Sequence, residues 1–276
     1  MKIKNIFKFL FFSSFLEKKF RLIQKRLRFI ISVFFLSFIM MISTFFYFDK
    51  ALFFIPILIF ATYFFTYFSI LEDIKKIEWL MLFLMPVFLS VVFYLFYFLF
   101  PVRWLTRLPF IIFYAISIYA ILLSSNIFNV GVEKSLALYR AAFSVNFFYQ
   151  IFLIFFIFNI LFSFRQDFFI NGLISFVIIF LFSLQLFWTV HLKKKIEKEI
   201  FFYSIFLATI VSEVVIVFSF LPLSINVFSL LPTGVYYSLA GLIYHFIDRR
   251  LFYQTVREFL IVLGFILLVV FLSVSW

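Results

Sequence analysis

Residues 29–71 read FIISVFFLSFIMMISTFFYFDKALFFIPILIFATYFFTYFSIL. This stretch holds two uncharged runs, 29–48 and 51–71, which are separated by Asp49 and Lys50 alone. A helix rises ~1.5 Å per residue, so about 20 apolar residues are needed to cross the ~30 Å hydrocarbon core of a bilayer. Each run meets that length. The stretch therefore predicts two antiparallel transmembrane helices joined by a tight turn.

The composition of the whole chain agrees with a membrane protein. Of the 276 residues, 67% are hydrophobic, 54 are Phe and 13% are charged, about half the charged share of a soluble domain. The mean hydropathy is +1.22. So little polar surface could not cover a soluble core, which excludes soluble enzymes, secreted modules, disordered chains and nucleic-acid-binding domains. The absence of Cys and the presence of only two His exclude thiolate chemistry and multi-histidine metal sites, so we expect no cofactor.

Breaking the sequence at its charged residues predicts an all-α bundle of about nine transmembrane spans. The predicted spans are 29–48, 51–71, 79–100, 108–129, 141–164, 168–190, 200–221, 225–247 and 259–276. Together they form a single transmembrane domain, 29–276, because no loop is long enough for a soluble domain. We interpret 1–28 as a basic tail whose residues 14–28 form an amphipathic helix in the membrane interface. The expected partners of this helix are anionic lipid headgroups, and no protein partner can be named from the sequence.

The distribution of Lys and Arg predicts the orientation of the bundle. With the N-terminus inside, the inner loops and the tail carry 20 Lys and Arg, whereas the outer loops carry 4. Cytoplasmic loops of membrane proteins are enriched in these residues. We therefore expect a multi-pass protein of the cytoplasmic membrane, with the N-terminus in the cytoplasm and the C-terminus outside. The formal net charge of +12 fits contact with headgroups better than contact with nucleic acid.

Glu213 is the one charged residue inside a long apolar run. A carboxylate in hydrocarbon costs about a few kcal/mol. We therefore expect Glu213 to face the bundle interior, to pair with a cation, or to be neutral. It is a candidate site for a proton, a cation or a polar ligand group; the alternative is a residue that fixes helix packing.

Arg103 and Arg107 interrupt the charge bias, because both fall in the predicted outer loop between Pro101 and Pro109. Their spacing of four residues places them on one face of a helix. Arginine matches the geometry of phosphate, so one interpretation is binding of a headgroup or phosphate. Other interpretations are an ion pair with Glu213 or ordinary anchoring at the interface.

Two further stretches have two interpretations each. The most polar stretch near a membrane boundary runs from Asn126 to Gln150 and includes Tyr139, Arg140 and Asn146. Asn146 and Gln150 share a helix face, and they predict either an inner-side polar cavity or hydrogen bonds between helices. The second stretch holds the small residues Gly234, Ser238 and Gly241 and follows Pro232. It predicts close packing against a neighbouring helix or, alternatively, a broken helix on a substrate path.

The sequence carries no motif that identifies a reaction. Phosphate-cradling glycine loops, zinc-protease motifs and nucleophile elbows are all absent. Three functions remain: a transporter or flippase of a small or lipid-linked substrate, a membrane enzyme acting on lipid-linked phosphate, and a non-catalytic membrane scaffold. The sequence best supports a polytopic membrane protein without a specific assigned role, and among specific roles we rank transport slightly ahead of an enzyme. The candidate binding residues are Glu213, Arg103, Arg107, Asn146 and Gln150.

Overall fold

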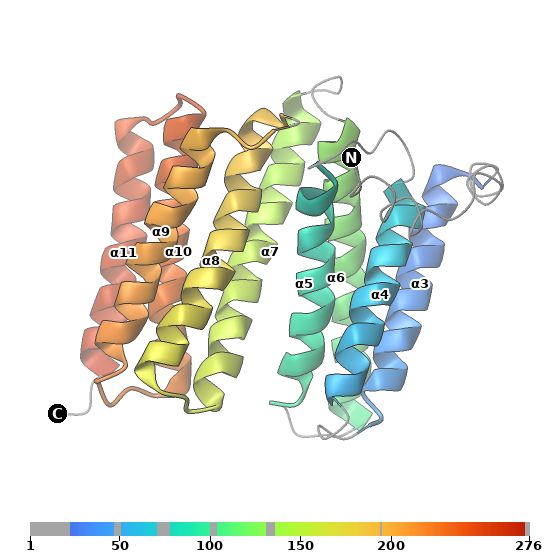
Figure 1. Cartoon of the computed structure of the whole chain (residues 1–276), viewed down its shortest axis with the longest axis horizontal. Coiled ribbons are helices and arrows are strands. Elements are labelled where there is room, and N and C mark those ends of the chain that lie inside the picture. Colours follow the sequence, from blue (N-terminus) through green and yellow to red (C-terminus); the bar gives the residue numbers. More distant parts are fainter. Residues whose placement is uncertain are drawn as a thin grey trace, which may run out of the picture.

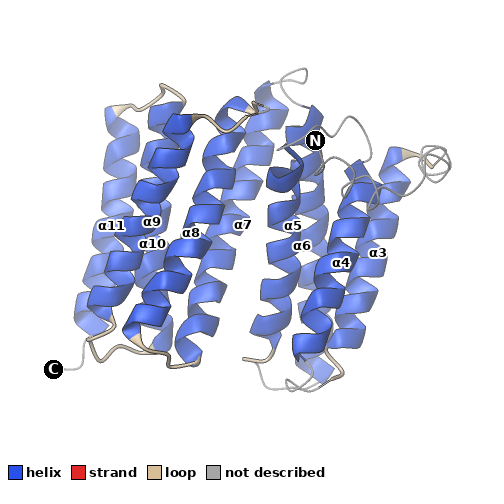
Figure 2. Cartoon of the chain, viewed as in Figure 1, coloured by secondary structure: helices blue, strands red, loops and turns tan. Residues whose placement is uncertain are grey.

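The computed structural model describes residues 23–46, 51–70, 78–99, 104–130, 136–193 and 195–273. Within these ranges every regular element is an α-helix and no strand occurs (Figure 2). The helices are α3 Lys25–Ser43, α4 Ala51–Ile70, α5 Glu78–Tyr97, α6 Trp104–Val130, α7 Leu136–Ser163, α8 Phe168–His191, α9 Lys198–Phe218, α10 Ile225–Ile247 and α11 Tyr253–Ser273. In this described part of the chain, all nine helices are long and apolar enough to cross a membrane. The predicted all-α membrane bundle is therefore confirmed.

The helix ends differ from the predicted spans mainly where a basic residue was taken as a boundary. α3 begins at Lys25 rather than Phe29, α6 at Trp104 rather than Leu108, and α7 at Leu136 rather than Ala141. Long basic side chains can lie in the first turns of a membrane helix because their stems reach back to the interface. Most of the predicted interfacial helix, 14–28, lies outside the described residues, and its last residues belong to α3.

The helices form two layers (Figure 1). One layer holds α4, α5, α8 and α9, and the other holds α3, α6, α7, α10 and α11. The first four helices, α3–α6, pack together as an N-terminal half, and α7–α11 pack together as a C-terminal half. α7 joins the halves, because it packs against α5 and α6 on one side and against α8 and α10 on the other.

Small hydroxyl side chains link neighbouring helices of the N-terminal half. Ser69 donates a hydrogen bond of 2.7 Å to the Ser32 hydroxyl, which ties α4 to α3. Thr62 donates to Ser90 at 2.9 Å, and Ser90 lies 2.8 Å from the Tyr114 hydroxyl, so α4, α5 and α6 are tied together. Such bonds satisfy polar groups that hydrocarbon cannot. In this chain, which has only 5 Gly, Ser and Thr therefore hold neighbouring helices together.

α10 packs closely against α11 through its small residues. Gly234 and Gly241 face α11, and a Cβ added at Gly241 would lie 2.3 Å from the Cζ atom of Phe259. Ser238 donates a hydrogen bond to the Phe259 carbonyl at 3.2 Å. α10 is continuous through Pro232. The close-packing interpretation is confirmed, and the broken-helix alternative is wrong.

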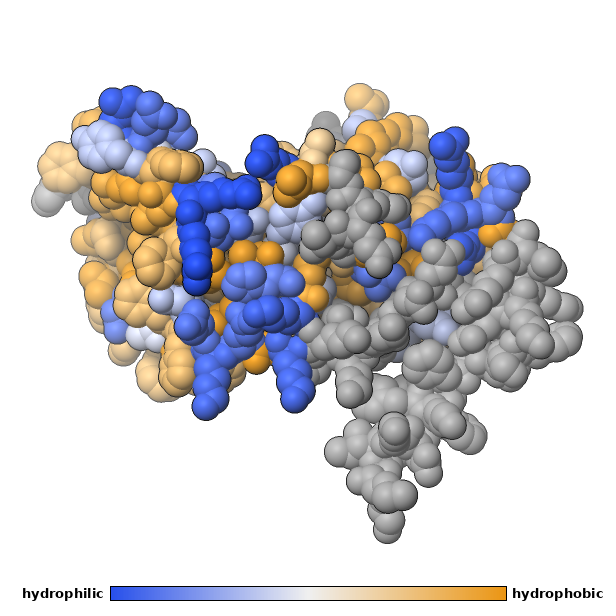
Figure 3. All heavy atoms as spheres, turned by 90° about the horizontal axis from the view of Figure 1, so that it is seen from above, coloured by the Kyte–Doolittle hydropathy of each residue, from blue (hydrophilic) through white to orange (hydrophobic). Residues whose placement is uncertain are grey.

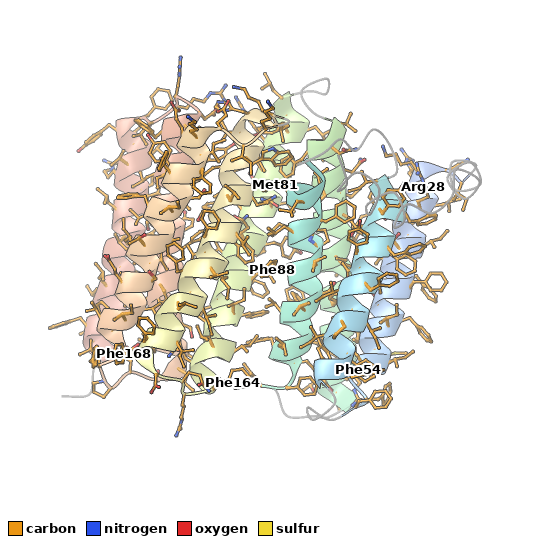
Figure 4. The ribbon with its side chains drawn as sticks, in the orientation of Figure 1. Arg28, Phe54, Met81, Phe88, Phe164 and Phe168 are labelled. Atoms are coloured by element: carbon orange, nitrogen blue, oxygen red, sulfur yellow. The ribbon has the colours of Figure 1, made fainter. Side chains whose placement is uncertain are left out.

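One end of the bundle carries most of the charge. At this basic end α3, α5, α7, α9 and α11 begin, and Figure 4 shows Arg28 and Met81 near it, with Phe54, Phe164 and Phe168 near the opposite end. Hydrophilic residues gather on the basic end when it is viewed from above (Figure 3). Its described Lys and Arg are Lys25, Arg26, Arg28, Arg140, Lys193, Lys195, Lys198, Arg249, Arg250 and Arg257. At the opposite end the described ones are Arg107 and Arg165.

A charged cluster fixes the turn between α8 and α9 at the basic end. Glu197 accepts a hydrogen bond from Lys193 and lies 2.9 Å from Nδ1 of His191. The hydrogen bond from the Lys193 ammonium group lowers the pKa of Glu197 below its usual value. These contacts link the end of α8 to the residue that precedes α9.

Candidate functional site

Three buried amides and a tyrosine meet between α7, α8 and α10. This amide cluster consists of Asn146 and Gln150 on α7, Gln185 on α8 and Tyr236 on α10. The Gln185 Oε1 atom accepts hydrogen bonds from Gln150 Nε2 at 2.6 Å and from Asn146 Nδ2 at 3.2 Å. The Tyr236 hydroxyl donates to Gln150 Oε1 at 3.0 Å. The cluster therefore fastens α7 to two neighbouring helices.

The geometry of the amide cluster favours helix packing over ligand binding. Gln150 and Tyr236 are fully buried, and the amides of Asn146, Gln150 and Gln185 satisfy one another. The sequence predicted that Asn146 and Gln150 share a face, but it missed Gln185 and Tyr236 as their partners. A usable signal was present: Gln185 is an isolated amide inside the apolar run 172–190. Such a group needs a partner on another helix.

Arg107 lies in the first turn of α6, not in a loop as the sequence predicted, and it is buried. Its Nε atom donates to the Tyr97 hydroxyl at 3.1 Å, and one terminal nitrogen donates to the Thr44 carbonyl at 3.2 Å. Its Cζ atom lies 4.2 Å from the centre of the Phe45 ring. Burial is tolerable because these contacts replace water around the guanidinium.

The guanidinium of Arg107 lines a pocket of about 520 Å³ at the end opposite the basic end. We call it the Arg107 pocket. Its hydroxyl groups come from Thr44, Tyr97 and Ser163. Its apolar walls come from Phe46, Leu95, Phe98, Leu99, Ile160 and Phe164. The pocket lies between the two halves of the bundle, since α3, α5 and α6 supply one side and α7 the other.

Glu213 is exposed on the surface of α9, so the expected interior placement is wrong. Its neighbours along the exposed stripe include Phe206 and Val217, which are 57% and 62% exposed. Glu213 lies five residues before the end of α9 at Phe218, or ~7.5 Å along the axis. From there a carboxylate can reach toward the polar interface, which lowers the cost of this position.

The structure does not bring Glu213 to Arg107. Arg107 contacts residues of the N-terminal half, whereas Glu213 is on α9 in the C-terminal half (Figure 1). Arg103 lies outside the described residues. Of the predicted site residues, the structure therefore places Asn146 and Gln150 together and Arg107 alone in a pocket. Comparison of the chain with protein-family models, curated proteins and solved structures gives no match.

Proposed function

We propose that this multi-pass protein binds the phosphate of a lipid-linked substrate at Arg107 and transports that substrate across the membrane as a flippase. The observation that carries the proposal is a buried guanidinium in a pocket whose walls are mostly apolar. Arginine binds phosphate through two parallel hydrogen bonds, and such charge-assisted bonds are stronger in a dry site. The apolar walls suit the first carbons of an attached lipid chain.

The size and chemistry of the Arg107 pocket support a bound headgroup. Its volume falls within the range of about 300–1,000 Å³ that ligand sites usually have. The Tyr97 hydroxyl lies beside the guanidinium, and Ser163 adds a further hydroxyl-bearing residue to the lining. Among the described residues of the lining there is no carboxylate and no histidine. The described groups are thus suited to binding, which is why we place transport ahead of an enzyme acting on lipid-linked phosphate.

The position of the pocket also supports transport. Ile160 and Ser163 of α7, and Phe164 directly after it, line the pocket opposite residues of the N-terminal half. The amide cluster ties α7 to α8 and α10, and we propose that α7 moves with the C-terminal half although it also packs against α5 and α6. A rocking motion of one half against the other would therefore open or close the pocket. We place the basic end in the cytoplasm, which puts the pocket at the outer leaflet of the cytoplasmic membrane.

The proposal is tested with purified protein in liposomes that contain a fluorescent, NBD-labelled polyprenyl phosphate. Dithionite added outside the liposomes quenches label only in the outer leaflet, so flipping appears as additional quenching. We expect flipping by the wild-type protein and a loss of about 10- to 100-fold with Arg107→Gln, because one charge-assisted hydrogen-bonding group is removed. Arg165→Gln is the matched control, since Arg165 is exposed at the same end.

The outcomes separate the alternatives. Flipping that is equal in both variants would overturn the assignment of Arg107. Binding of the labelled lipid without flipping would overturn transport but keep the binding site. Release of inorganic phosphate from the probe would favour the membrane enzyme instead.

A further inference from the structure

A second pocket, of about 590 Å³, lies at the basic end between α7, α8, α10 and α11. We call it the Arg140 pocket. Its walls combine apolar side chains with two arginines and several hydroxyls. The residues that matter here are Tyr139, Arg140, Phe143 and Ser144 of α7, Tyr244 of α10, Arg250 of the following turn, and Phe252 and Thr255 at the start of α11. It is far from the Arg107 pocket, at the other end of α7.

The charge of the Arg140 pocket favours an anion. Arg140 and Arg250 both line it, together with His245 and Asp248. Asp248 is 3.5 Å from the Nε atom of Arg250 and offsets that charge in part. Within the described chain the guanidinium of Arg140 makes no ion pair and no hydrogen bond. Among the described lining residues the net charge is positive, and the exposed Arg140 is free to turn toward a ligand.

The floor of this pocket is fixed by a pair of tyrosines. The Tyr139 hydroxyl donates its proton to the Thr189 carbonyl. The Tyr244 hydroxyl, 3.3 Å away, must then be the donor in its contact with Tyr139. The Tyr244 ring also stacks on Phe143, with 3.9 Å between the ring centres. A floor held by these contacts is formed before any ligand arrives, which reduces the entropy lost on binding.

Exposed apolar side chains form part of the rim of the pocket. Leu136 and Phe252 line it and are 65% and 66% exposed. Ser144 is also exposed, two turns into α7 from its start. Phe143 lies about one turn deeper along α7 than Arg140, so a ligand entering from the basic end would meet an arginine before an apolar ring. That gradient matches a lipid, with its headgroup at the surface and its chains in hydrocarbon.

We infer that the Arg140 pocket binds the phosphate of an anionic phospholipid from the leaflet at the basic end. Basic pockets between transmembrane helices are a recurrent mode of anionic lipid recognition. Arg140 and Arg250 hold the phosphate oxygens, Thr255 offers a hydroxyl in the same pocket, and Phe143 contacts the start of the acyl chains. This site is independent of the substrate proposed for the Arg107 pocket.

Native mass spectrometry of the delipidated full-length chain tests the inference. An Arg107→Gln background removes any contribution from the other pocket. We expect phosphatidylglycerol to bind more tightly than phosphatidylcholine, which has similar chains but no net charge. Arg140→Gln should lower the affinity for phosphatidylglycerol about fivefold, as expected for the loss of one basic residue near the surface. The double variant, Arg140→Gln with Arg250→Gln, should lower that affinity about 25-fold. Arg257→Gln, an exposed arginine of the same end outside the pocket, should have little effect.

Each other result counts against the inference. Equal weakening by Arg257→Gln would show a general effect of surface charge. Equal affinity for the two lipids would show that charge is not recognised. If millimolar inorganic phosphate bound to the protein and displaced all phosphatidylglycerol, the pocket would be assigned to free phosphate instead. Arg140 is exposed and makes no bond within the described chain, so the single variant should fold and keeps the test decisive even if the double variant does not.

Discussion

At the scale of single residues, Gln185 is the centre of the amide cluster, because its Oε1 atom accepts from both Asn146 and Gln150. Gln185→Leu removes this acceptor, so the side-chain N–H groups of Asn146 and Gln150 that donate to it lose their partner. In membrane proteins such bonds contribute about 0.6 kcal/mol each on average, and an unsatisfied buried group costs about 1–3 kcal/mol. We expect the midpoint of thermal unfolding in detergent, followed by tryptophan fluorescence, to fall by about 3–8 °C.

The control for this variant is Gln166→Leu, which removes an exposed amide from the turn before α8. Its unfolding midpoint should stay within about 1–2 °C of the wild type. If the two variants behaved alike, the amide cluster would not hold α7 to its neighbours, and the argument that α7 moves with the C-terminal half would fail.

Sequence alone could predict that Asn146 and Gln150 point at other helices, since buried amides need partners. Hydropathy could not predict the direction of Glu213. α9 carries apolar residues on every face, so its hydropathy alone does not show which face is buried; the small residues Ser204, Ala208 and Ser212, spaced by four, do mark that face. The free-energy cost of a carboxylate in hydrocarbon implied that Glu213 faces the bundle interior. A carboxylate near a helix end can also lower this cost by reaching the polar interface, and the structure places Glu213 in that way.

At the scale of helix pairs, the contact of α10 with α11 depends on the missing side chain of Gly241. Gly241→Ala would place a Cβ 2.3 Å from the Phe259 Cζ atom. Overpacking of this kind costs about 1–3 kcal/mol, so we expect the unfolding midpoint in detergent to fall by several degrees. Adding Phe259→Leu, which removes the clashing ring atoms, should restore part of the loss.

Gly264→Ala on α11 provides the matched control, because an added Cβ there meets nothing within 4 Å. It should leave the midpoint unchanged or raise it slightly, since alanine favours helix more than glycine does. A Gly241→Ala variant as stable as Gly264→Ala would contradict the close packing of these two helices.

The helices themselves were predictable because the bilayer fixes their length: α10, Ile225–Ile247, fills the interval within which the eighth span was predicted. The Arg107 pocket was not predictable. Its walls come from α3, α5, α6 and α7, which are distant in sequence, and a span prediction that stops at each charge places Arg107 in a loop. Local composition reports the length of an apolar run, whereas a pocket depends on which runs pack together.

At the scale of the whole molecule, α7 connects the two candidate sites. Its first turns, with Tyr139 and Arg140, line the Arg140 pocket, and its last turn, with Ser163, lines the Arg107 pocket. Its middle carries Asn146 and Gln150 of the amide cluster. A shift of α7 would therefore change both pockets together, so a lipid held at one end of the helix could alter the other.

The orientation of the molecule is open to a direct test, because the chain has no cysteine and an introduced one labels alone. Lys195→Cys and Arg165→Cys flank α8, whose 24 residues extend ~36 Å, enough to cross the bilayer. In intact cells an impermeant maleimide should label Arg165→Cys, whereas Lys195→Cys should label only after permeabilisation. Labelling of both from one side would contradict the crossing by α8, and a reversed pattern would contradict the cytoplasmic basic end. Neither variant should itself invert the protein: Arg165→Cys removes a positive charge from the sparse end and strengthens the charge bias, while Lys195→Cys leaves most basic residues of the other end in place.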